Sequence, residues 1–410
     1  MKTTQTGAIG PISKTYPTDE ASAQDCVNWF WADFFPAWTT RAIDPAGLGY
    51  FDLMDGNGVP QAERKTVLAQ ARLLFTFSHL ALLSGDPAHK AAAEVARTAL
   101  SAFRKPSGLY CRALARDGAP LEEKDAQLAT SYDQCFVILG LSTWGKLSPS
   151  VETAAELEHC WKAIMNLLVD PVTGLLLEHD GLDEPAAASA PRRAQNPHMH
   201  LYEAALQAFE VTGDGHWMER AKSIRAKGLE YFFDVETGTV AEFIAPDLSE
   251  LRDYEGSRRE IGHQCEWAWL LTREVDLGGD PEMQSVAARL LDFADRHGFA
   301  ADGAMQGAAF DAVSTDLKRN ETTFLLWPQT EAIKTYAIRS NEEDNGVKAE
   351  ALTRLIFQRY FAGCPAFVNQ LDADGQVIWA DGLSRLHYHL VLALTEGARA
   401  GLWANPTSRS

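Results

Sequence analysis

The sequence predicts an all-α protein, an (α/α)6 barrel of about twelve helices with short β-hairpins and long loops over one end. Two observations lead to this prediction. Segments that suit β-hairpins recur along the chain at intervals of 59 to 66 residues. Between them, apolar residues stand three and four positions apart, as they do on one face of a helix. Antiparallel helix pairs repeated six times can close into a double ring, with one helix of each pair inside.

The hairpin-like segments combine glycine or Asp-Gly turns with aromatic and β-branched residues, a composition typical of short strands joined by tight turns. They read GLGYFDLMDGNG from 47, SGLYCRALARDG from 107, TGLLLEHDG from 173, TGTVAEFIAPD from 237, HGFAADG from 297, and a weaker one that begins near Gly363 and ends in DADGQVIWADG. The glycines that mark the six repeats stand at 49, 108, 174, 238, 298 and 363.

Each interval between hairpins has room for two helices. The segment 69–83 (AQARLLFTFSHLALL) has helical apolar spacing, and Gly-Asp turns follow such segments at 84 (SGDP), 212 (TGDG) and 278 (GGDP). Glycine ends a helix, and aspartate, with proline in two of the turns, begins the next. An open α-solenoid would also repeat, but its units usually have about 34–47 residues. No Pro- or Ser-rich linker divides the chain, so we expect residues 1–410 to form a single domain.

The chain is acidic, with a formal net charge of −19. Such a surface repels nucleic acid and anionic membranes, so we expect neither as a partner. Six cysteines without a CxxC pair are typical of a reducing compartment. The N-terminal MKTTQTGAIGPISKT lacks the apolar segment of a secretory signal, and apolar stretches such as Leu73–Leu83 are too short to cross a bilayer. We expect a cytoplasmic monomer or homodimer.

A polar or aromatic residue follows each hairpin glycine at a similar distance of 22 to 29 residues. These residues are Arg72, Tyr132, Asn196, His263, Trp327 and His389. Equivalent positions in a closed ring face the same centre, and six such residues are hard to explain as core filling. The spacing therefore predicts that they line one central pocket.

Two of the predicted inner helices begin with an imidazole three residues before a carboxylate, namely His200 with Glu203 and His263 with Glu266. Residues at i and i+3 share a helix face, and a neighbouring carboxylate fixes the tautomer of histidine and raises its basicity. Further polar residues stand at two other helix starts, Gln329 with Glu331 and His387 with His389. Since His387 and His389 are only two apart, only one of them can face the pocket.

A metal centre is the main alternative for this group of residues. Dimetal sites in helical bundles use Glu-x-x-His, whereas the order here is His-x-x-Glu. Three histidines could also bind zinc. Arg72 would place a fixed cation in the same pocket, which disfavours a bound metal ion. We therefore expect no metal and no other cofactor.

Five motifs resemble those of the N-acylglucosamine 2-epimerase family, and within it the D-mannose isomerase branch. They are QAR at 70–72, NPHMH at 196–200, GHQCEW at 262–267, LWPQTE at 326–331 and YHL at 388–390. The resemblance covers nearly the whole chain and implies the (α/α)6 barrel. It implies that His263 and His389 are the acid–base pair, completed by Arg72, His200 and Glu266. It also implies that the sugar pocket is lined by Tyr132, Asn196, Trp327, Gln329 and Glu331.

The expected activity is metal-independent interconversion of D-mannose and D-fructose, with D-lyxose and D-xylulose as a further pair. His263, oriented by Glu266, would open the sugar ring. His389 would carry the C2 proton to C1 through a cis-enediol(ate), which the Arg72 cation would stabilise. The expected partner is thus a small monosaccharide substrate.

Four alternatives stay open at this point. A sugar 2-epimerase that interconverts mannose and glucose would need a proton donor on each face of C2. An isomerase of 6-sulfo-6-deoxyglucose could hold its sulfonate with the arginines at 252, 258 and 259. A glycoside hydrolase or lyase would commonly need two carboxylates at the scissile bond. Finally, a non-catalytic sugar- or protein-binding protein could keep the same fold.

Overall fold

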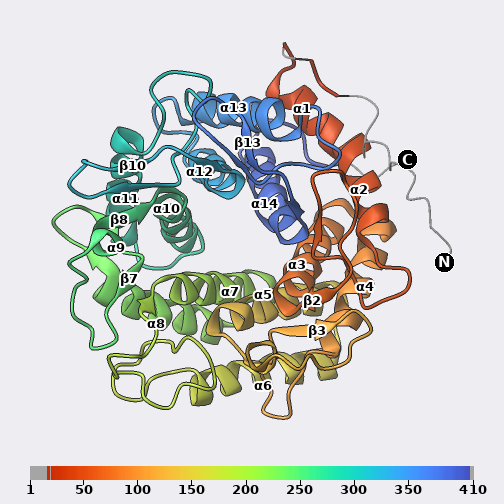
Figure 1. Cartoon of the computed structure of the whole chain (residues 1–410), viewed down its shortest axis with the longest axis vertical. Helices are drawn as coiled ribbons and strands as arrows, with labels where there is room; N and C mark the ends of the chain where they lie inside the picture. The colour runs from red at the N-terminus through yellow and green to blue at the C-terminus, as the bar shows by residue number, and fades with distance from the viewer. Residues whose placement is uncertain (1–15, 19, 407–410) are drawn as a thin grey trace.

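Two concentric rings of helices make up the described part of the chain, residues 16–18 and 20–406 of a computed structural model (Figure 1). The predicted (α/α)6 barrel is confirmed. The inner ring consists of α3 (Val67–Ser84), α5 (Ser131–Leu147), α7 (Asn196–Thr212), α10 (Ile261–Asp276), α12 (Leu326–Ile338) and α14 (His387–Arg399). Each inner helix contacts the next, and α14 returns to α3. The prediction that residues 1–15 carry no secretory signal falls outside the described residues.

The outer helices alternate with the inner ones along the chain. The first outer helix is continuous through a π-helical turn and comprises α1 (Ala23–Trp29), η1 (Phe30–Phe34) and α2 (Phe35–Ala42). The others are α4 (Pro87–Ser101), α6 (Val151–Leu167), α8 (Gly215–Phe232), α11 (Met283–His297) and α13 (Asn345–Ile356), the last extended by the π-helical η3 (Phe357–Phe361). Three short helical segments lie in loops, namely η2 (Lys124–Gln127), α9 (Tyr254–Ser257) and η4 (Ser384–Leu386).

Short antiparallel strands join neighbouring repeats at one end of the barrel. The residues just before an inner helix pair with the hairpin of the next repeat in β2–β3, β4–β7, β8–β9, β11–β12 and β14–β1, and in the isolated bridge between Thr130 and His179. The strands are β1 (Leu53–Met54), β2 (Arg64–Thr66), β3 (Ala113–Ala115), β4 (Arg193–Ala194), β5 (Phe233–Asp234), β6 (Thr239–Val240), β7 (Phe243–Ile244), β8 (Arg258–Glu260), β9 (Ala312–Ser314), β10 (Asn320–Glu321), β11 (Phe324–Leu325), β12 (Gln370–Leu371), β13 (Val377–Trp379) and β14 (Gly382–Leu383). These pairings form a collar around the hairpin end.

A buried side chain near the start of the inner helices clamps the preceding hairpin. Gln70 accepts a hydrogen bond from the Tyr50 N–H at 3.0 Å and donates one to the Tyr50 carbonyl at 3.0 Å. The same two bonds join Gln134 to Tyr110, Gln264 to Val240 and Gln329 to Ala309, while His198 accepts one bond from the Leu176 N–H. These five residues, which we call the clamp residues, fix the register between each hairpin and its helix.

The sixth inner helix, α14, has no such bond among the described residues. His387 stands two residues before His389, as Gln70 stands two before Arg72. Its imidazole is fully buried, without a hydrogen-bond partner in the described chain, and lies among aromatic rings such as those of Trp38 and Phe367. His387 therefore belongs to the core, and His389 is the histidine of this pair that reaches the centre.

One of the six glycines that mark the repeats is misassigned. Gly49, Gly108 and Gly174 have φ between 60° and 94°, a left-handed conformation that a side chain disfavours, as do Gly238 and Gly363. Gly298 instead ends α11 with φ of −97°. The corresponding turn glycine is Gly307, with φ of 84°, two residues before the clamped Ala309. The fifth repeat simply has a longer hairpin.

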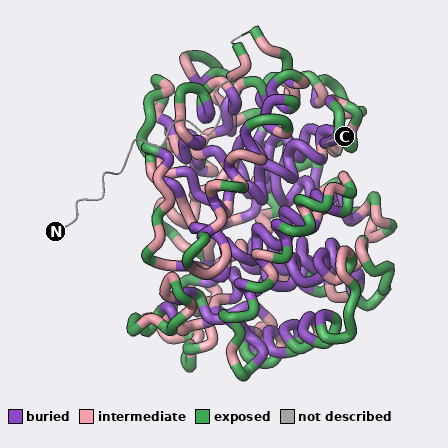
Figure 2. The backbone as a smooth tube through the Cα atoms, turned by 90° about the vertical axis from the view of Figure 1, so that its right-hand side faces the viewer, coloured by how far each residue is buried: buried purple, intermediate pink, exposed green. Residues whose placement is uncertain are grey.

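The inner helices are buried on nearly all sides, whereas the outer helices expose one face (Figure 2). Helix α3 is 18 residues long and apolar enough by length and composition to cross a membrane, which the shorter stretch Leu73–Leu83 did not suggest. However, 72% of its residues are buried against neighbouring helices in this fold. Its apolar character follows from its place between the outer ring and the barrel interior.

Candidate active site

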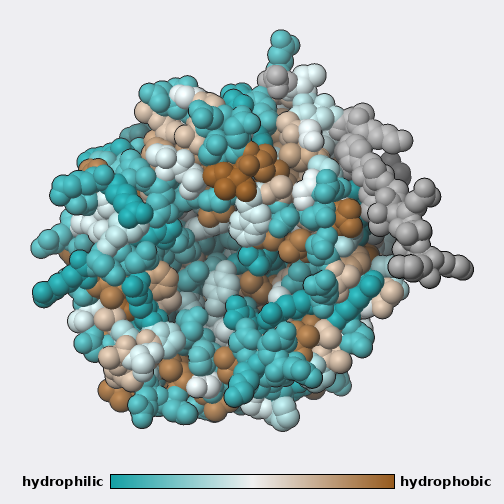
Figure 3. All heavy atoms as spheres, viewed as in Figure 1, coloured by the Kyte–Doolittle hydropathy of each residue, from teal (hydrophilic) through white to brown (hydrophobic). Residues whose placement is uncertain are grey.

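A cavity of about 620 Å³ opens at the hairpin end, inside the inner ring, where the molecular surface is hollowed at its centre (Figure 3). This is the usual size of a small-molecule site. The residues from the inner helices and their N-terminal flanks that line it include Arg72, Tyr132, Asp133, Asn196, His200, His263, Glu266, Trp327, Arg385 and His389. The hairpins add Arg112, Glu178, Glu242 and Asn369.

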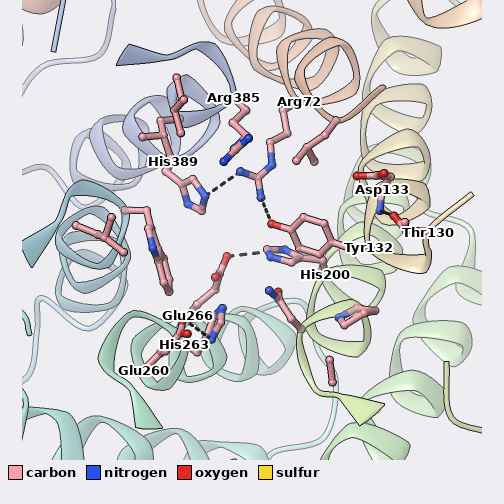
Figure 4. Close-up of a pocket in the computed structure, with 18 of the residues that line it drawn as sticks. Arg72, Thr130, Tyr132, Asp133, His200, Glu260, His263, Glu266, Arg385 and His389 are labelled. Carbon is pink, nitrogen blue, oxygen red and sulfur yellow. Dashed lines mark hydrogen bonds and ion pairs between the residues drawn. The ribbon is translucent and has the colours of Figure 1, made fainter. Parts of the chain in front are cut away.

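Six residues, one from each inner helix, form a closed circle at the base of the site. They are Arg72, Phe136, His200, Glu266, Glu331 and His389, and five of them stand two residues after a clamp residue. Arg72 Nη1 lies 3.1 Å from His389 Nε2 (Figure 4). His389 Nδ1 lies 2.6 Å from Glu331 Oε1. On the other side of Arg72, the guanidinium stacks 4.0 Å from the centroid of the Phe136 ring.

The rest of the circle is closed by a buried lysine and a histidine. Lys334 Nζ bridges Glu331 at 2.6 Å and Glu266 at 3.7 Å. His200 Nδ1 lies 4.0 Å from Glu266, and its ring is 4.6 Å from the Phe136 ring. Every member therefore touches the next, directly or through Lys334, so the base of the site is a rigid charged network.

His389 sits between cations and one carboxylate. Arg72 can only donate to Nε2, so Nε2 is unprotonated and the neutral ring carries its hydrogen on Nδ1, where it donates to Glu331. Burial lowers the pKa of His389 well below its usual value, and Arg72 and Lys334 lower it further. Burial, together with the Glu266 carboxylate, raises the pKa of Glu331. His389 is thus a neutral imidazole with a lone pair towards the cavity.

His263 lies on α10 among carboxylates instead. Its Nδ1 is 2.7 Å from Glu242 Oε2 and 3.2 Å from Glu260 Oε2. Burial alone would lower the pKa of His263, but these two carboxylates outweigh it and raise the pKa to about 9. His263 is therefore an imidazolium at neutral pH. The expectation that Glu266 orients His263 is wrong, because Glu266 faces His200 and Lys334 across the base of the site.

The second predicted imidazole–carboxylate pair is present. His200 Nδ1 lies 3.0 Å from Glu203 Oε2, and the Tyr388 hydroxyl donates to the other oxygen of Glu203. Burial opposes ionisation of Glu203, but its bonds to His200 help to lower its pKa. This arrangement holds the His200 ring edge-on to Tyr132, at 5.4 Å between centroids.

Several cavity atoms have no hydrogen-bond partner among the described residues. They are Arg72 Nε, Asp133 Oδ2, Asn196 Oδ1 and both carboxylate oxygens of Glu266. Buried polar atoms normally have partners, because an unsatisfied one costs about 1–3 kcal/mol. A ligand with many hydroxyl groups, which both donate and accept, would satisfy such a mixed set. Burial raises the pKa of Asp133 to about 6.

Trp327 forms an aromatic wall that touches both histidines. Its ring centroid lies 4.8 Å from that of His263 and 6.0 Å from that of His389. The indole rests on Gly262, where an added Cβ would come within 2.3 Å of the ring. Glycine at this position therefore lets Trp327 approach the start of α10, and the two imidazoles face the same space.

Eight of the ten predicted site residues line the cavity, namely Arg72, Tyr132, Asn196, His200, His263, Glu266, Trp327 and His389. Gln329 and Glu331 do not. Gln329 is a clamp residue, fully buried with its amide on Ala309, and Glu331 lies behind His389. The expectation that these two residues line the sugar pocket is therefore wrong. Glu331 can act on a ligand only through His389.

Three charged residues beside the histidines are absent from the expected set. Glu242 and Glu260 contact His263 directly, and Lys334 pairs with Glu331 behind His389. Glu242 comes from the hairpin, where periodicity gives no information. Alignment of the hairpins on their clamped residues would have indicated Glu242. It stands two residues after the clamped Val240, as Asp52 stands two after the clamped Tyr50. Asp52 binds the backbone N–H of Thr66, and Glu242 binds that of Glu260 at 3.0 Å. The same hairpin acid thus supports the start of a helix in both repeats.

The arginines considered for a sulfonate do not line the cavity. Arg258 is paired with Glu321 at 2.9 Å and with Glu260 at 2.5 Å. Arg259 is buried and donates to Thr239 at 2.8 Å. Their positive charges are therefore already used to hold the segment before α10.

Within the described chain, three groups of side chains bring potential metal ligands within 4.8 Å of one another: His200 with Glu203 and Glu266, Glu242 with Glu260 and His263, and Glu266 with Glu331 and His389. In the third group, the ammonium of Lys334 already lies 2.6 Å from Glu331. In the second, both carboxylates are directed at the proton of His263 Nδ1. These cations and protons compete with a metal ion, and the metal-independent activity stays a prediction.

The chain is similar in sequence and fold to known sugar epimerases and isomerases. The sequence profile of the family N-acylglucosamine 2-epimerase (GlcNAc 2-epimerase) matches residues 49–393. A mannose-6-phosphate isomerase of Rhizobium meliloti is 26% identical over 386 residues, 91% of this chain and 96% of the relative. A D-mannose isomerase of Thermobifida fusca is 27% identical over 309 residues, covering 70% and 72%. A crystal structure of D-mannose isomerase has the same fold, with a TM-score of 0.78 at 19% identity over 94% of this chain and 100% of that one.

Proposed function

The chain belongs to the N-acylglucosamine 2-epimerase family, and from this membership we propose that it is an aldose–ketose isomerase that interconverts D-mannose and D-fructose. D-Lyxose and D-xylulose form a second candidate pair. Relatives named for isomerisation of mannose or its phosphate, at 26% and 27% identity, support the choice of sugar. The unsatisfied donors and acceptors of the cavity support a polyhydroxylated ligand.

One observation carries the proposal: two histidines that face one cavity have opposite protonation states. His263 is held as an imidazolium by Glu242 and Glu260, and His389 is held neutral by burial and by nearby cations. Proton transfer between sugar carbons needs an acid and a base of this kind in the same site. Two titratable groups with pKa values driven apart are the usual sign of such a division of roles.

The first step is ring opening. His263 donates a proton to the ring oxygen of the bound aldopyranose as the bond between C1 and that oxygen breaks, and the anomeric hydroxyl gives its proton to the Glu266 carboxylate as the C1 carbonyl forms. Glu266, whose two oxygens have no hydrogen-bond partner in the described chain, is available to accept hydrogen bonds from sugar hydroxyls. Trp327 packs against the sugar face beside His263.

The second step moves the proton from C2 to C1. His389 Nε2 removes the C2 proton, and Arg72 moves its hydrogen bond from Nε2 to the oxygen of the forming enediolate, whose negative charge it stabilises. Glu331, 2.6 Å from Nδ1, stabilises the transient imidazolium. His389 then returns the proton to C1 on the same face, while the proton of the C2 hydroxyl passes to O1. One base therefore completes the isomerisation.

A solvent-exchange experiment tests this reaction. Purified protein is incubated with D-mannose in D2O with a chelator and followed by NMR. Fructose with deuterium at C1 is the expected product, because the base exchanges its proton with solvent during the transfer. Activity that disappears with the chelator and returns with a divalent metal would contradict the metal-independent mechanism. Absence of exchange with mannose and lyxose would favour a binding protein without catalysis.

A 2-epimerase is the second candidate, and the imidazolium state of His263 favours it specifically. If His263 reached C2 from the face opposite His389, it could return a proton there and convert mannose to glucose. For a 2-epimerase, the same experiment would give glucose with deuterium at C2 in place of fructose labelled at C1.

We also propose a cytoplasmic location, which the six free cysteines support, five of them buried.

A further inference from the structure

One cation in the cavity wall has no partner in the part of the chain that the structure describes. Arg385 lies on η4, one turn before His389, and lines the cavity beside Arg72 with its guanidinium towards the centre (Figure 4). Among the described residues it makes no hydrogen bond and no ion pair. The other two arginines of the wall are engaged, since Arg72 binds Tyr132 and His389, and Arg112 lies 3.9 Å from Asp125.

The surroundings of Arg385 make a free guanidinium unfavourable. Burial and the neighbouring Arg72 both lower the pKa of Arg385. The carboxylates of Asp52 and Asp133 raise this pKa only through space, because neither forms an ion pair with Arg385. A partly buried cation beside a second cation is costly unless something neutralises it. No described residue of the protein does so.

All three arginines of the cavity wall come from the repeats of α3, α5 and α14. Asp133 and Glu178 lie on the same side, and burial raises the pKa of both carboxyl groups, whereas Glu242, Glu260 and Glu266 come from the hairpin and the start of α10. A ligand that carries one negative group would therefore bind with this group towards Arg385 and away from the three glutamates. The planar fork of arginine matches the oxygens of a phosphate or sulfonate better than it matches single hydroxyl groups.

We propose that Arg385 is a specificity-determining residue that binds an oxyanion, a phosphate or sulfonate, carried by the sugar substrate. The assignment rests on the proposed function for the choice of a sugar, and it adds that an anionic sugar is preferred over the neutral one. The oxyanion binds at the guanidinium of Arg385, while the sugar hydroxyls meet Asn196 and Glu266. Arg385 touches the substituent and takes no part in the proton transfer.

Binding of hexitols tests this subsite without any turnover, because an open-chain alcohol cannot isomerise. D-Mannitol, D-mannitol 6-phosphate and the corresponding 6-deoxy-6-sulfonate are titrated into the wild type by calorimetry. We expect the anionic hexitols to bind ~10- to 100-fold more tightly than mannitol, the usual range for charge-assisted hydrogen bonds. A gain for the phosphate that increases from pH 5.5 to 7.5 identifies the dianion as ligand, and an equal gain for the sulfonate at both pH values identifies a single negative charge as sufficient.

The Arg385→Gln variant should lose this preference and bind all three hexitols with the affinity of mannitol for the wild type. Arg385→Lys should keep part of it, since it keeps the charge and loses the fork. Arg112→Gln is the matched control from the same wall and should change the ratio less than threefold. The melting temperatures of the variants verify folding, and little change is expected because the Arg385 side chain makes no hydrogen bond or ion pair within residues 16–18 and 20–406.

Three outcomes would overturn the assignment: equal binding of neutral and anionic hexitols by the wild type, equal losses for both in Arg385→Gln, or loss of the preference in Arg112→Gln alone. The second would mean that Arg385 binds sugar hydroxyls. If the anionic hexitols bind through Arg385 but no sugar is isomerised, the subsite stands and the proposed function fails. If mannose is isomerised and the hexitols bind equally, the reverse holds.

Discussion

The two histidines of the cavity occupy similar places on α10 and α14, yet their surroundings are opposite. His263 has two carboxylates at Nδ1, at 2.7 and 3.2 Å. His389 has one carboxylate at Nδ1 and a guanidinium at Nε2, with Lys334 behind that carboxylate. The first histidine keeps its extra proton and the second does not. The difference teaches that the residues packed behind two identical side chains can drive their pKa values in opposite directions.

Removing the base is the strongest way to break this comparison. His389→Asn keeps the size of the side chain and loses the basic nitrogen, so kcat/KM for mannose should fall by roughly 10²–10⁴-fold, the usual contribution of a general base. Exchange of the C2 proton with D2O should fall by the same factor as kcat/KM. Circular dichroism and a melting curve verify the fold. Turnover within tenfold of the wild type would remove His389 from its role.

Removing the buried Lys334 ammonium tests, by its effect on the free energy of unfolding, whether this cation holds the carboxylates around His389 together. Lys334→Met leaves Glu331 and Glu266 without their common ammonium, and breaking a buried ion pair in this way costs about 3–5 kcal/mol. Urea denaturation measures the loss. Lys318→Met is the matched control: its ion pair is 82% exposed on the lysine side, and its midpoint should not change measurably. Equal midpoints for both variants would contradict the role of Lys334.

The same variant sharpens the comparison through pH. Lys334 lowers the pKa of His389, so its removal should raise that pKa. The base is then protonated at a higher pH than in the wild type. The acid limb of the profile of kcat/KM against pH should therefore move to higher pH in Lys334→Met, while the alkaline limb stays in place.

Weakening the acidic side should have a smaller effect. The proposed mechanism needs protonated His263, so the wild-type rate should fall as pH rises through about 9. Glu242→Gln removes the carboxylate at 2.7 Å and lowers the pKa of His263, so the alkaline limb should move to lower pH, with kcat at neutral pH reduced ~10- to 100-fold. Glu260→Gln, at 3.2 Å, should shift the limb less. An unchanged alkaline limb in Glu242→Gln would show that another group controls it.

The repeat could be predicted from the sequence because its physical causes are local. Glycine and Asp-Gly turns, helix caps and apolar spacing recur often enough to indicate the barrel, and all six residues expected at its centre line the cavity. They nevertheless stand at different levels of the helices. Arg72 and His389 belong to the circle at the base. Asn196 and Trp327 lie nearer the helix starts, two residues before the clamp residues His198 and Gln329.

The partners of these residues could not be predicted from helix periodicity. Spacing at i and i+3 correctly paired His200 with Glu203, since both lie on α7 and face the same neighbour. The same rule failed for His263, because a hairpin carboxylate 21 positions earlier folds back onto it and Glu266 turns towards Lys334. Gln329 was misplaced for a similar reason, as its amide is held by the Ala309 backbone. Long-range returns of the chain decide these contacts.

The circle at the base of the site closes between α3 and α14, and the Arg72–His389 contact joins positions 317 apart. The strands β1 and β14 close the collar at the same seam. Contacts of such sequence separation form late, since the intervening chain must be ordered first. An incompletely folded chain would therefore have most of its helices and no reactive base. Local opening between α3 and α14 would separate Arg72 from His389 and abolish the proposed activity. The half-life of activity on heating should therefore depend on the stability of this one helix contact.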